Sequence, residues 1–86
     1  MTTYRLQIKR SAEVDLRRLA EPIFTRVNER ILALRDDPRP TGVRKLQGQQ
    51  EGWRIRVGDY RVLYLIDDTA RLITIVRVRH RRDVYR

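Results

Sequence analysis

Residues 53–66 are the part of this chain that most constrains its fold. Apolar side chains occupy every second position on both sides of the dipeptide Gly58-Asp59. Such alternation is typical of strands with one buried face, and a Gly in the first position suits a two-residue hairpin turn. The segment therefore predicts an antiparallel hairpin in which Arg56 lies directly opposite Arg61.

The Arg56–Arg61 pair has two interpretations. Like charges that face each other across two strands destabilise a sheet by up to about 1 kcal/mol, so stability alone does not favour the pair. A phosphate held between the two guanidinium groups would turn this repulsion into binding. Alternatively, both side chains extend into water, where screening makes the repulsion small.

A third strand is expected at residues 72–78, which are rich in β-branched side chains. We expect the turn at residues 67–71 to place Arg61 opposite Arg77, because this register separates apolar from basic side chains. The basic row then continues through Arg79 and Arg81.

The same register predicts two apolar surfaces. A small band beside the basic row, with Leu63 opposite Ile75 and Leu65 opposite Ile73, would offer a groove for a partner segment. The face toward the core would collect Trp53, Ile55, Val57, Tyr60, Val62, Tyr64, Ile66, Leu72, Val76 and Val78.

The first part of the chain predicts one strand and two helices. Residues 4–9 alternate between apolar and polar side chains, which is the pattern of a strand. Ser11 is the expected N-cap of a helix that runs through about Ala20. Pro22 suits the first turn of a second helix, which should end before Asp36.

Residues 39–52 are polar and contain proline and three glycines, so they predict a loop. The chain has 86 residues, which is enough for one small core. We therefore expect residues 1–86 to form a single α+β domain: a strand, two helices and then a three-stranded antiparallel meander, with the helices packed on one face of the sheet.

The charge of the chain indicates a polyanionic partner. The sequence holds 20 Lys and Arg against 11 Asp and Glu, a formal net charge of +9. Residues 44–86 carry 11 basic and 5 acidic side chains, whereas residues 1–43 carry 9 and 6. The excess of +6 in the second half, against +3 in the first, places the expected binding face on the hairpin and the strand after it.

Composition also excludes several classes of protein. No apolar run approaches the roughly 18 residues of a membrane span, and no secretory signal is visible, so we expect a cytoplasmic protein with no membrane partner. The sequence has no Cys and one His, which predicts neither a metal site nor a cofactor.

The C-terminal residues suggest chemistry on RNA. Backbone cleavage needs a base for the 2′-OH, cations for the developing phosphorane charge and a proton for the leaving 5′-oxygen. His80 could exchange protons, Arg81 could supply charge with Arg56 and Arg61, and Tyr85 could stack a base or position a phosphate. Alternatively, His80 is solvated and Tyr85 caps the core. The expected RNA- or phosphate-binding residues are Lys45, Arg54, Arg77, Arg79 and Arg82.

Four motifs of the sequence resemble the RelE/ParE superfamily of bacterial toxin–antitoxin toxins, and RelE-like messenger RNA endonucleases in particular. They are Ser11-Ala12-Glu13-x-Asp15-Leu16, Lys45-Leu46-x-Gly48, the stretch from Gly52 to Tyr64, and His80-Arg81-Arg82-Asp83-Val84-Tyr85. The resemblance implies the strand, helix and sheet order inferred above. It also implies a cognate antitoxin that wraps and neutralises the toxin.

The resemblance implies two possible activities. RelE-like members cleave messenger RNA in the ribosomal A site without a metal, whereas ParE-like members poison DNA gyrase. By position, Arg61 matches the phosphate-binding Arg of RelE-like enzymes, Arg81 their terminal catalytic Arg and Tyr85 their C-terminal Tyr. Arg54 and Arg56 stand where those enzymes often have Lys.

These two arginines are a departure from the RelE pattern. Arg stays protonated and cannot readily act as a base, so His80 is the expected replacement as the proton-transfer group. Because Arg replaces Lys at these two positions, a ParE-like inhibitor of DNA gyrase is an alternative function. A basic module that only binds nucleic acid or an acidic partner, without catalysis, is the third possibility.

Overall fold

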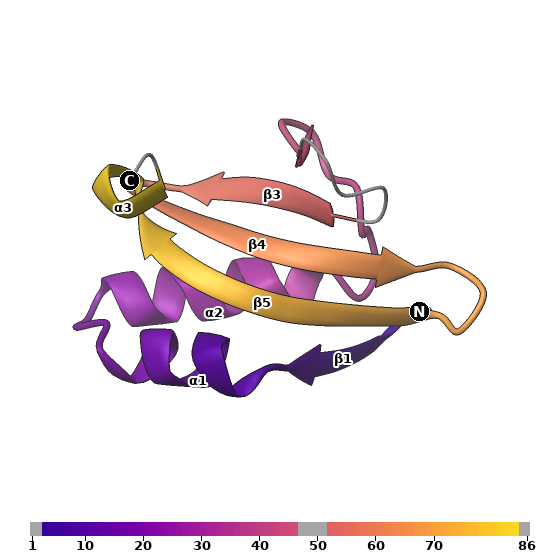
Figure 1. Cartoon of the computed structure of the whole chain (residues 1–86), viewed down its shortest axis with the longest axis horizontal. Helices are drawn as coiled ribbons and strands as arrows, with labels where there is room; N and C mark the ends of the chain where they lie inside the picture. The colour runs from indigo at the N-terminus through magenta and orange to yellow at the C-terminus, as the bar shows by residue number, and fades with distance from the viewer. Residues whose placement is uncertain (1–2, 47–51, 85–86) are drawn as a thin grey trace.

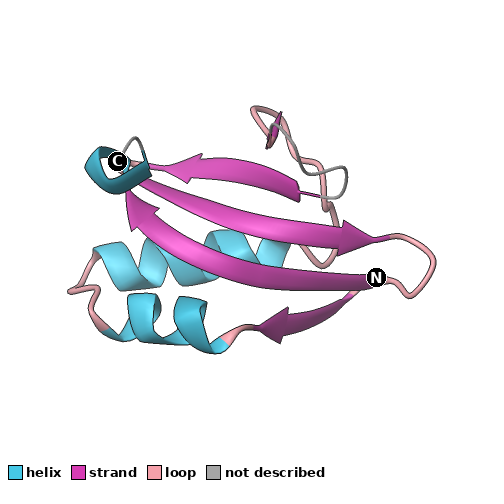
Figure 2. Cartoon of the chain, viewed as in Figure 1, coloured by secondary structure: helices cyan, strands magenta, loops and turns pink. Residues whose placement is uncertain are grey.

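Two helices cover one face of a five-stranded sheet in the computed structural model, which describes residues 3–46 and 52–84 (Figure 1). The strand order is β1-β5-β4-β3-β2. Figure 2 shows the helices gathered behind the sheet, with a short third helix at the end of the chain. The elements are β1 (Arg5–Ile8), α1 (Arg10–Arg17), α2 (Ile23–Ala33), β2 (Arg44–Lys45), β3 (Gly52–Val57), β4 (Tyr60–Asp67), β5 (Leu72–His80) and α3 (Arg81–Val84).

This arrangement confirms the expected α+β class, with a strand, two helices and an antiparallel meander β3-β4-β5. The sheet as a whole is mixed, because β1 runs parallel to β5. The chain between these two strands contains both helices and strands β2 to β4, and so provides the long crossover that a parallel pair requires. No helix in the described residues is long and apolar enough to cross a bilayer.

The sheet contains one strand that the sequence did not predict. Arg44 and Lys45 form β2 inside the expected loop, where they pair with Arg54 and Trp53 of β3. Two residues are too few to show an alternation of apolar and polar side chains, so this strand leaves no periodic signal.

The core lies between the helices and the sheet. It is built from aliphatic side chains and one tyrosine, Tyr64, which is fully buried on β4. The Tyr64 hydroxyl donates a hydrogen bond of 2.7 Å to the carbonyl oxygen of Pro38, so its polar end is satisfied. The buried apolar residues are Ala12, Leu16, Val27, Ile31, Leu34, Ile55, Val57, Val62, Tyr64, Ile66, Ile73, Ile75 and Val78.

The predicted hairpin is confirmed in every pair, including Arg56 with Arg61. The predicted register of the next pair of strands is wrong. Arg61 faces Arg79 rather than Arg77. Leu63 faces Arg77, whereas the next residue of β4 faces Ile75, so one residue of β5 is left out of the pairing.

The residue left out is Val76, and this β-bulge changes which side chains of β5 reach the core. Ile73 and Ile75 are fully buried, whereas Leu72 and Val76, which we expected in the core, are half-buried. The expected apolar band beside the basic row is therefore wrong, because two of its four members belong to the core.

The helix boundaries also differ from the prediction. Lys9, not Ser11, is the N-cap residue of α1. The Ser11 hydroxyl instead donates a hydrogen bond of 2.7 Å to the carbonyl of Val76, which lies on the edge of β5 beyond the end of β1. The helix ends at Arg17 rather than Ala20. Pro22 is the N-cap of α2, one position before the first turn in which we expected it.

Candidate nucleic-acid interface

Three arginines from three strands lie in one row across the sheet. Arg56 of β3 pairs with Arg61 of β4, and Arg61 pairs in turn with Arg79 of β5. Neighbouring strands are about 4.8 Å apart, so the row places three cations within reach of one or two phosphates. The sequence predicted such a row, with Arg77 in the place that Arg79 occupies.

The row leads into a basic groove on β3. One open pocket of about 520 Å³ is lined by Arg44, Arg54, Arg56 and Arg61, together with the backbone turn at Gly42. A second pocket, of about 550 Å³, adjoins it. Its lining shares Arg44 and Arg54 and adds Lys45. We call these five basic residues, Arg44, Lys45, Arg54, Arg56 and Arg61, the basic groove.

Arg44 is the residue of this groove that sequence reasoning missed. Its only sequence signal is its position beside Lys45, in a segment without periodicity. The short ladder between β2 and β3 pairs it with Arg54 and so brings it onto the sheet.

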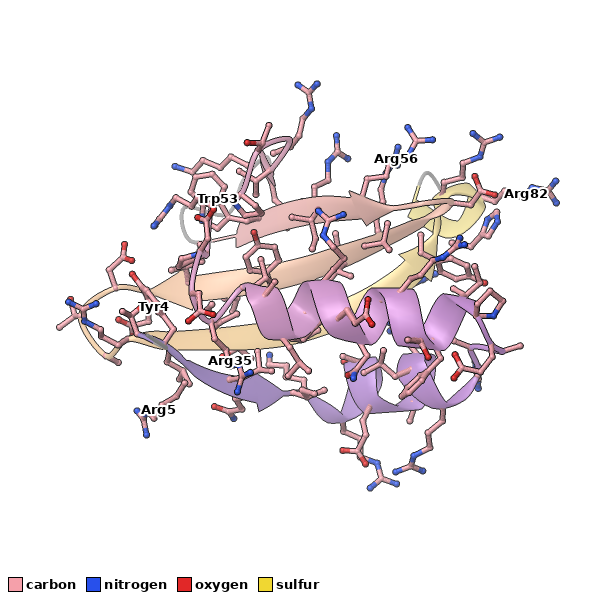
Figure 3. All side chains as sticks on the ribbon, turned by 180° about the vertical axis from the view of Figure 1, so that it is seen from behind. Tyr4, Arg5, Arg35, Trp53, Arg56 and Arg82 are labelled. Atoms are coloured by element: carbon pink, nitrogen blue, oxygen red, sulfur yellow. The ribbon has the colours of Figure 1, made fainter. Side chains whose placement is uncertain are left out.

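The turn between β3 and β4 fixes the positions of two arginines at the end of the sheet. The Arg56 Nε donates a hydrogen bond of 3.0 Å to the carbonyl of Gly58. The backbone N–H of Arg81 donates one of 2.7 Å to the carbonyl of Asp59, and the Arg81 Nε lies 4.0 Å from the Asp59 carboxylate. Figure 3 shows Arg56 and Arg82 extending outward at this end, far from Arg5 on the opposite edge of the sheet.

His80 lies outside the basic groove. It pairs with Tyr60, one ladder position from Arg61 and Arg79, and the two rings meet edge to face with centroids 5.2 Å apart. The ring lines a different pocket, of about 280 Å³, between α1 and the end of β5. The Nδ1 accepts a hydrogen bond of 3.2 Å from the backbone N–H of Arg82. In the neutral ring the proton is therefore on Nε2.

Arg77 is held by a carboxylate on α1. Its Nε and one terminal nitrogen donate to Asp15 at 2.8 and 3.1 Å, and the backbone N–H of Val78 donates to the same carboxylate at 2.9 Å. Asp15 thus satisfies the edge of β5 that β1 does not reach. Arg77 is part of this ion pair, and it lines the pocket beside α1 rather than the basic groove.

The remaining predicted residues lie at the end of the chain. Arg81 and Arg82 belong to α3 and are exposed. Tyr85 lies outside the described residues. No group of three or more metal-ligating side chains occurs in the part of the chain that the structure describes.

At the opposite end of the sheet, a cluster of paired charges anchors the segment that leads to β2. Asp68 accepts hydrogen bonds from the Tyr4 hydroxyl at 2.6 Å and from Arg39 at 2.9 Å. The Arg39 guanidinium also lies 5.0 Å from the ring centre of Trp53, over which Lys45 lies at 5.8 Å. The Arg39 hydrogen bond, followed by that of Tyr4, holds the pKa of Asp68 below its usual value.

Comparison with known proteins places the chain in a family. The family model of ParE toxins of type II toxin–antitoxin systems matches residues 6–85. The chain belongs to this family, within the RelE/ParE superfamily. Toxin RelG of Mycobacterium tuberculosis is 35% identical to it over 85 residues, which cover 96% of this chain and 97% of the relative.

Solved structures of the superfamily share its fold. A chain of the archaeal RelE–RelB complex from Pyrococcus horikoshii superposes with a TM-score of 0.82 at 31% identity, covering 92% of this chain and 96% of that chain. A chain of the RelBE2 toxin–antitoxin complex from Mycobacterium tuberculosis gives a TM-score of 0.78 at 30% identity, covering 91% and 98%.

Proposed function

We propose that this toxin is a metal-independent endoribonuclease that cleaves messenger RNA, with the ribosome as the expected setting. The observation that carries the proposal is the basic groove, continued by the Arg56–Arg61–Arg79 row. The groove is open and lined by guanidinium groups, which bind phosphate oxygens in forked pairs. A single RNA strand laid across it meets cations contributed by four adjacent strands.

In the proposed reaction, the 2′-oxygen of one nucleotide attacks the neighbouring phosphorus and the bond from phosphorus to the 5′-oxygen breaks. The 2′-OH gives its proton to a base, and the leaving 5′-oxygen takes up a proton from that base or from water. The products are a 2′,3′-cyclic phosphate and a free 5′-hydroxyl. Arg56 and Arg61 would hold the non-bridging oxygens, on which negative charge grows in the phosphorane. Arg81, beside the same turn, would supply charge near the leaving oxygen.

The proton from the 2′-OH needs an acceptor other than an arginine. The expectation that His80 exchanges this proton stays a prediction, because the ring lines a pocket apart from the groove and its unprotonated Nδ1 already accepts a hydrogen bond from the Arg82 N–H. As the base, His80 would have to give up this bond. We expect the His80→Ala variant to lose the acidic limb of the pH–rate profile if the imidazole is the base. A profile that keeps its shape would assign proton transfer to another group.

We further propose that a cognate antitoxin binds and neutralises the toxin. The two similar solved structures are complexes, RelE with RelB from Pyrococcus horikoshii and the toxin–antitoxin complex RelBE2 from Mycobacterium tuberculosis. We expect over-expression of the chain alone to arrest growth, and co-expression of the antitoxin encoded beside it to restore growth. Harmless over-expression would favour a module that binds without catalysis.

Primer extension on messenger RNA in a translating extract tests the endonuclease. We expect discrete cuts with the intact protein and none with the Arg61→Ala, Arg81→Ala double variant. Arg5→Ala is the matched control, because it removes an exposed arginine from the opposite edge of the sheet. Equal cutting by the double variant and the control would contradict the proposal.

Inhibition of DNA gyrase is the second candidate, favoured by the match to the ParE family model and by Arg in place of Lys at positions 54 and 56. Under this hypothesis the basic groove would bind DNA or an acidic surface of the enzyme rather than a scissile phosphate. Supercoiling by purified gyrase should then stop when the toxin is added. Unimpaired supercoiling, with cut messenger RNA in the extract, would eliminate this candidate.

A further inference from the structure

We propose that the pocket between α1 and the end of β5 binds one nucleobase of the RNA, next to the phosphate held by the arginine row. This inference rests on the proposed function, and it adds a base-binding subsite to the phosphate-binding groove. The pocket has a volume of about 280 Å³. The walls that matter here are formed by Arg18 and Leu19, which directly follow α1, by Tyr60 from β4, and by Arg79 and His80 from β5.

The chemistry of these walls fits a planar heterocycle. Tyr60 and His80 present two rings at an interplanar angle of 86°, and Leu19 adds a half-buried apolar side. Arg18 and Arg79 contribute guanidinium planes, which stack on bases as aromatic rings do. Single-stranded RNA is recognised in this way, by stacking on the base face and hydrogen bonds at the base edge.

An uncharged base suits this pocket better than a second phosphate does. Arg77, which also lines it, is already neutralised by Asp15 at 2.8 Å. Arg18 is the C-cap residue of α1, so the negative end of that helix faces the pocket. These two features lower the local positive potential, whereas the basic groove has neither a helix C-terminus nor an acidic side chain among its lining residues.

The pocket also offers donors for the acceptor atoms of a base. The Nδ1 of His80 is occupied by the Arg82 N–H, which leaves Nε2 as a donor. The Tyr60 hydroxyl makes no hydrogen bond to the residues that the structure describes, so it is available as donor or acceptor. A base edge can therefore be read without displacing an existing bond.

The pocket is close enough to the arginine row for one nucleotide to reach both. Tyr60 and His80 are paired one position along the ladder from Arg61 and Arg79, about 3.3 Å along each strand, with their side chains toward the opposite face of the sheet. Arg79 belongs to the row and also lines the pocket. This part of β5 has no strand beyond it, since β1 pairs only as far as Ile75. Ser11 and Asp15 of α1 bond this edge at Val76 and Val78. A base that enters the pocket would therefore pass the edge of β5 beyond Val78.

Binding of short single-stranded RNA to the full chain tests the subsite without requiring cleavage. We expect Arg18→Ala to weaken binding about fivefold or more, as removal of one stacking partner does. Arg17→Ala is the matched control, because it removes the same charge from the neighbouring exposed position, where Arg17 pairs with Glu13 instead of lining the pocket. Equal losses in the two variants would overturn the inference.

RNA with a single abasic nucleotide distinguishes a base from a phosphate. At one position of the oligonucleotide, removal of the base should weaken binding to the wild type but leave binding to Arg18→Ala unchanged. A second variant, Tyr60→Phe, keeps the ring and should lose about two- to tenfold through the hydroxyl. If Arg18→Ala weakens intact and abasic RNA equally at every position, the pocket binds phosphate and the inference is wrong.

The same experiment separates this inference from the proposed function. If Arg61→Ala reduces RNA binding and cleavage but no position is sensitive to base removal, only the subsite is wrong. If a base-sensitive position is found and no messenger RNA is cut, the subsite stands and the endonuclease fails. Protection of a fluorescent 2-aminopurine at the sensitive position, lost in Arg18→Ala, would support the subsite independently.

Discussion

Charged side chains are arranged differently at the two ends of the sheet: opposite charges pair at one end, and like charges gather at the other. At the turn between β4 and β5, Asp68 binds both Tyr4 and Arg39, and Arg71 lies 5.8 Å from the ring centre of Tyr4. At the turn between β3 and β4, arginines from three strands and α3 gather, and the Asp59 carboxylate lies 4.0 Å from the Nε of Arg81.

The difference is between opposite charges that pair with one another at Asp68 and like charges that face one another across three strands. Exposed ion pairs contribute little to stability, but the hydrogen bonds of Asp68 to Tyr4 and Arg39 join three segments that are distant in sequence and so fix the path toward β2. The row of arginines gains nothing from mutual proximity, because like charges opposite each other destabilise a sheet. An anionic ligand would reverse that effect, and the following predictions test this comparison.

The largest expected effect is on cleavage by Arg61→Ala. Removal of one preorganised donor to a transition-state oxyanion typically lowers the rate by about 10²- to 10³-fold. We expect this loss in the first-order rate of messenger RNA cleavage, measured at a temperature at which circular dichroism shows that the variant is folded. Arg35→Ala, which removes an arginine beside the helices, is the control. An equal loss of cleavage rate in this variant would contradict the special role of the arginine row.

The next effect concerns Asp15, the buried carboxylate that joins α1 to the edge of β5. We expect Asp15→Ala to lower the free energy of unfolding by about 2 kcal/mol, less than for a fully buried pair because the Arg77 side chain is 37% exposed. Glu13→Ala, on the same helix, removes an exposed pair and should cost only about 0.3 kcal/mol. Denaturant titration measures both, and equal values would contradict the role assigned to Asp15.

Salt should weaken RNA binding steeply. If the basic groove neutralises about four phosphates of single-stranded RNA, affinity falls about 50-fold between 50 and 200 mM salt. Fluorescence anisotropy measures the slope, which should become shallower by the equivalent of about one phosphate in Arg54→Ala. Arg39→Ala should leave the slope unchanged, because Arg39 is paired with Asp68. An affinity for RNA that does not change with salt concentration would contradict phosphate binding in the basic groove.

Tyr64 tests the anchoring of the segment before β2. Its hydroxyl is bonded to Pro38, and burial raises the pKa of the phenol well above its usual value. Tyr64→Phe should lower the free energy of unfolding by about 1 kcal/mol, because the Pro38 carbonyl loses its donor. Tyr60→Phe, whose hydroxyl has no such bond, is the control for denaturant titration. An identical stability for the two variants would show that the Pro38 contact contributes nothing.

The hairpin was predictable because its turn residues and its alternation agree, so a single register satisfies both. The pairing of β4 with β5 was not, because apolar residues occur in both phases along these strands. Leu63 and Tyr64 are both apolar, as are Ile75 and Val76, and the pattern therefore fits more than one register. The bulge resolves the conflict through packing against the helices, which local sequence does not encode.

The candidate site was predictable only where it depends on the hairpin register, and not where it depends on the pairing of β4 with β5. Arg56 and Arg61 follow from the hairpin register alone. The position of Arg77 depended on the misassigned register, and its pairing with Asp15 joins residues 62 positions apart in sequence. His80 directly follows Arg79 of the arginine row, but neighbouring side chains of a strand point to opposite faces, so sequence proximity overstated the proximity of His80 to the groove.

The smallest expected effect is the pH dependence at the paired end. The hydrogen bonds from Arg39 and Tyr4 lower the pKa of Asp68 in the folded state, so the ionised form is favoured by folding. Its stabilisation is therefore complete above the pKa of the unfolded chain, about 3.9, and is lost as the pH falls through the lower folded value. Asp68→Asn should be slightly less stable than the wild type at pH 6, and the difference should shrink below pH 4.

Thermal unfolding at a series of pH values measures this difference in stability, with Asp67→Asn as the control on the same turn. A difference that stays constant down to pH 2 would mean that Asp68 acts through its shape and not through its charge, and the contrast between the two ends would then rest on the arginine row alone.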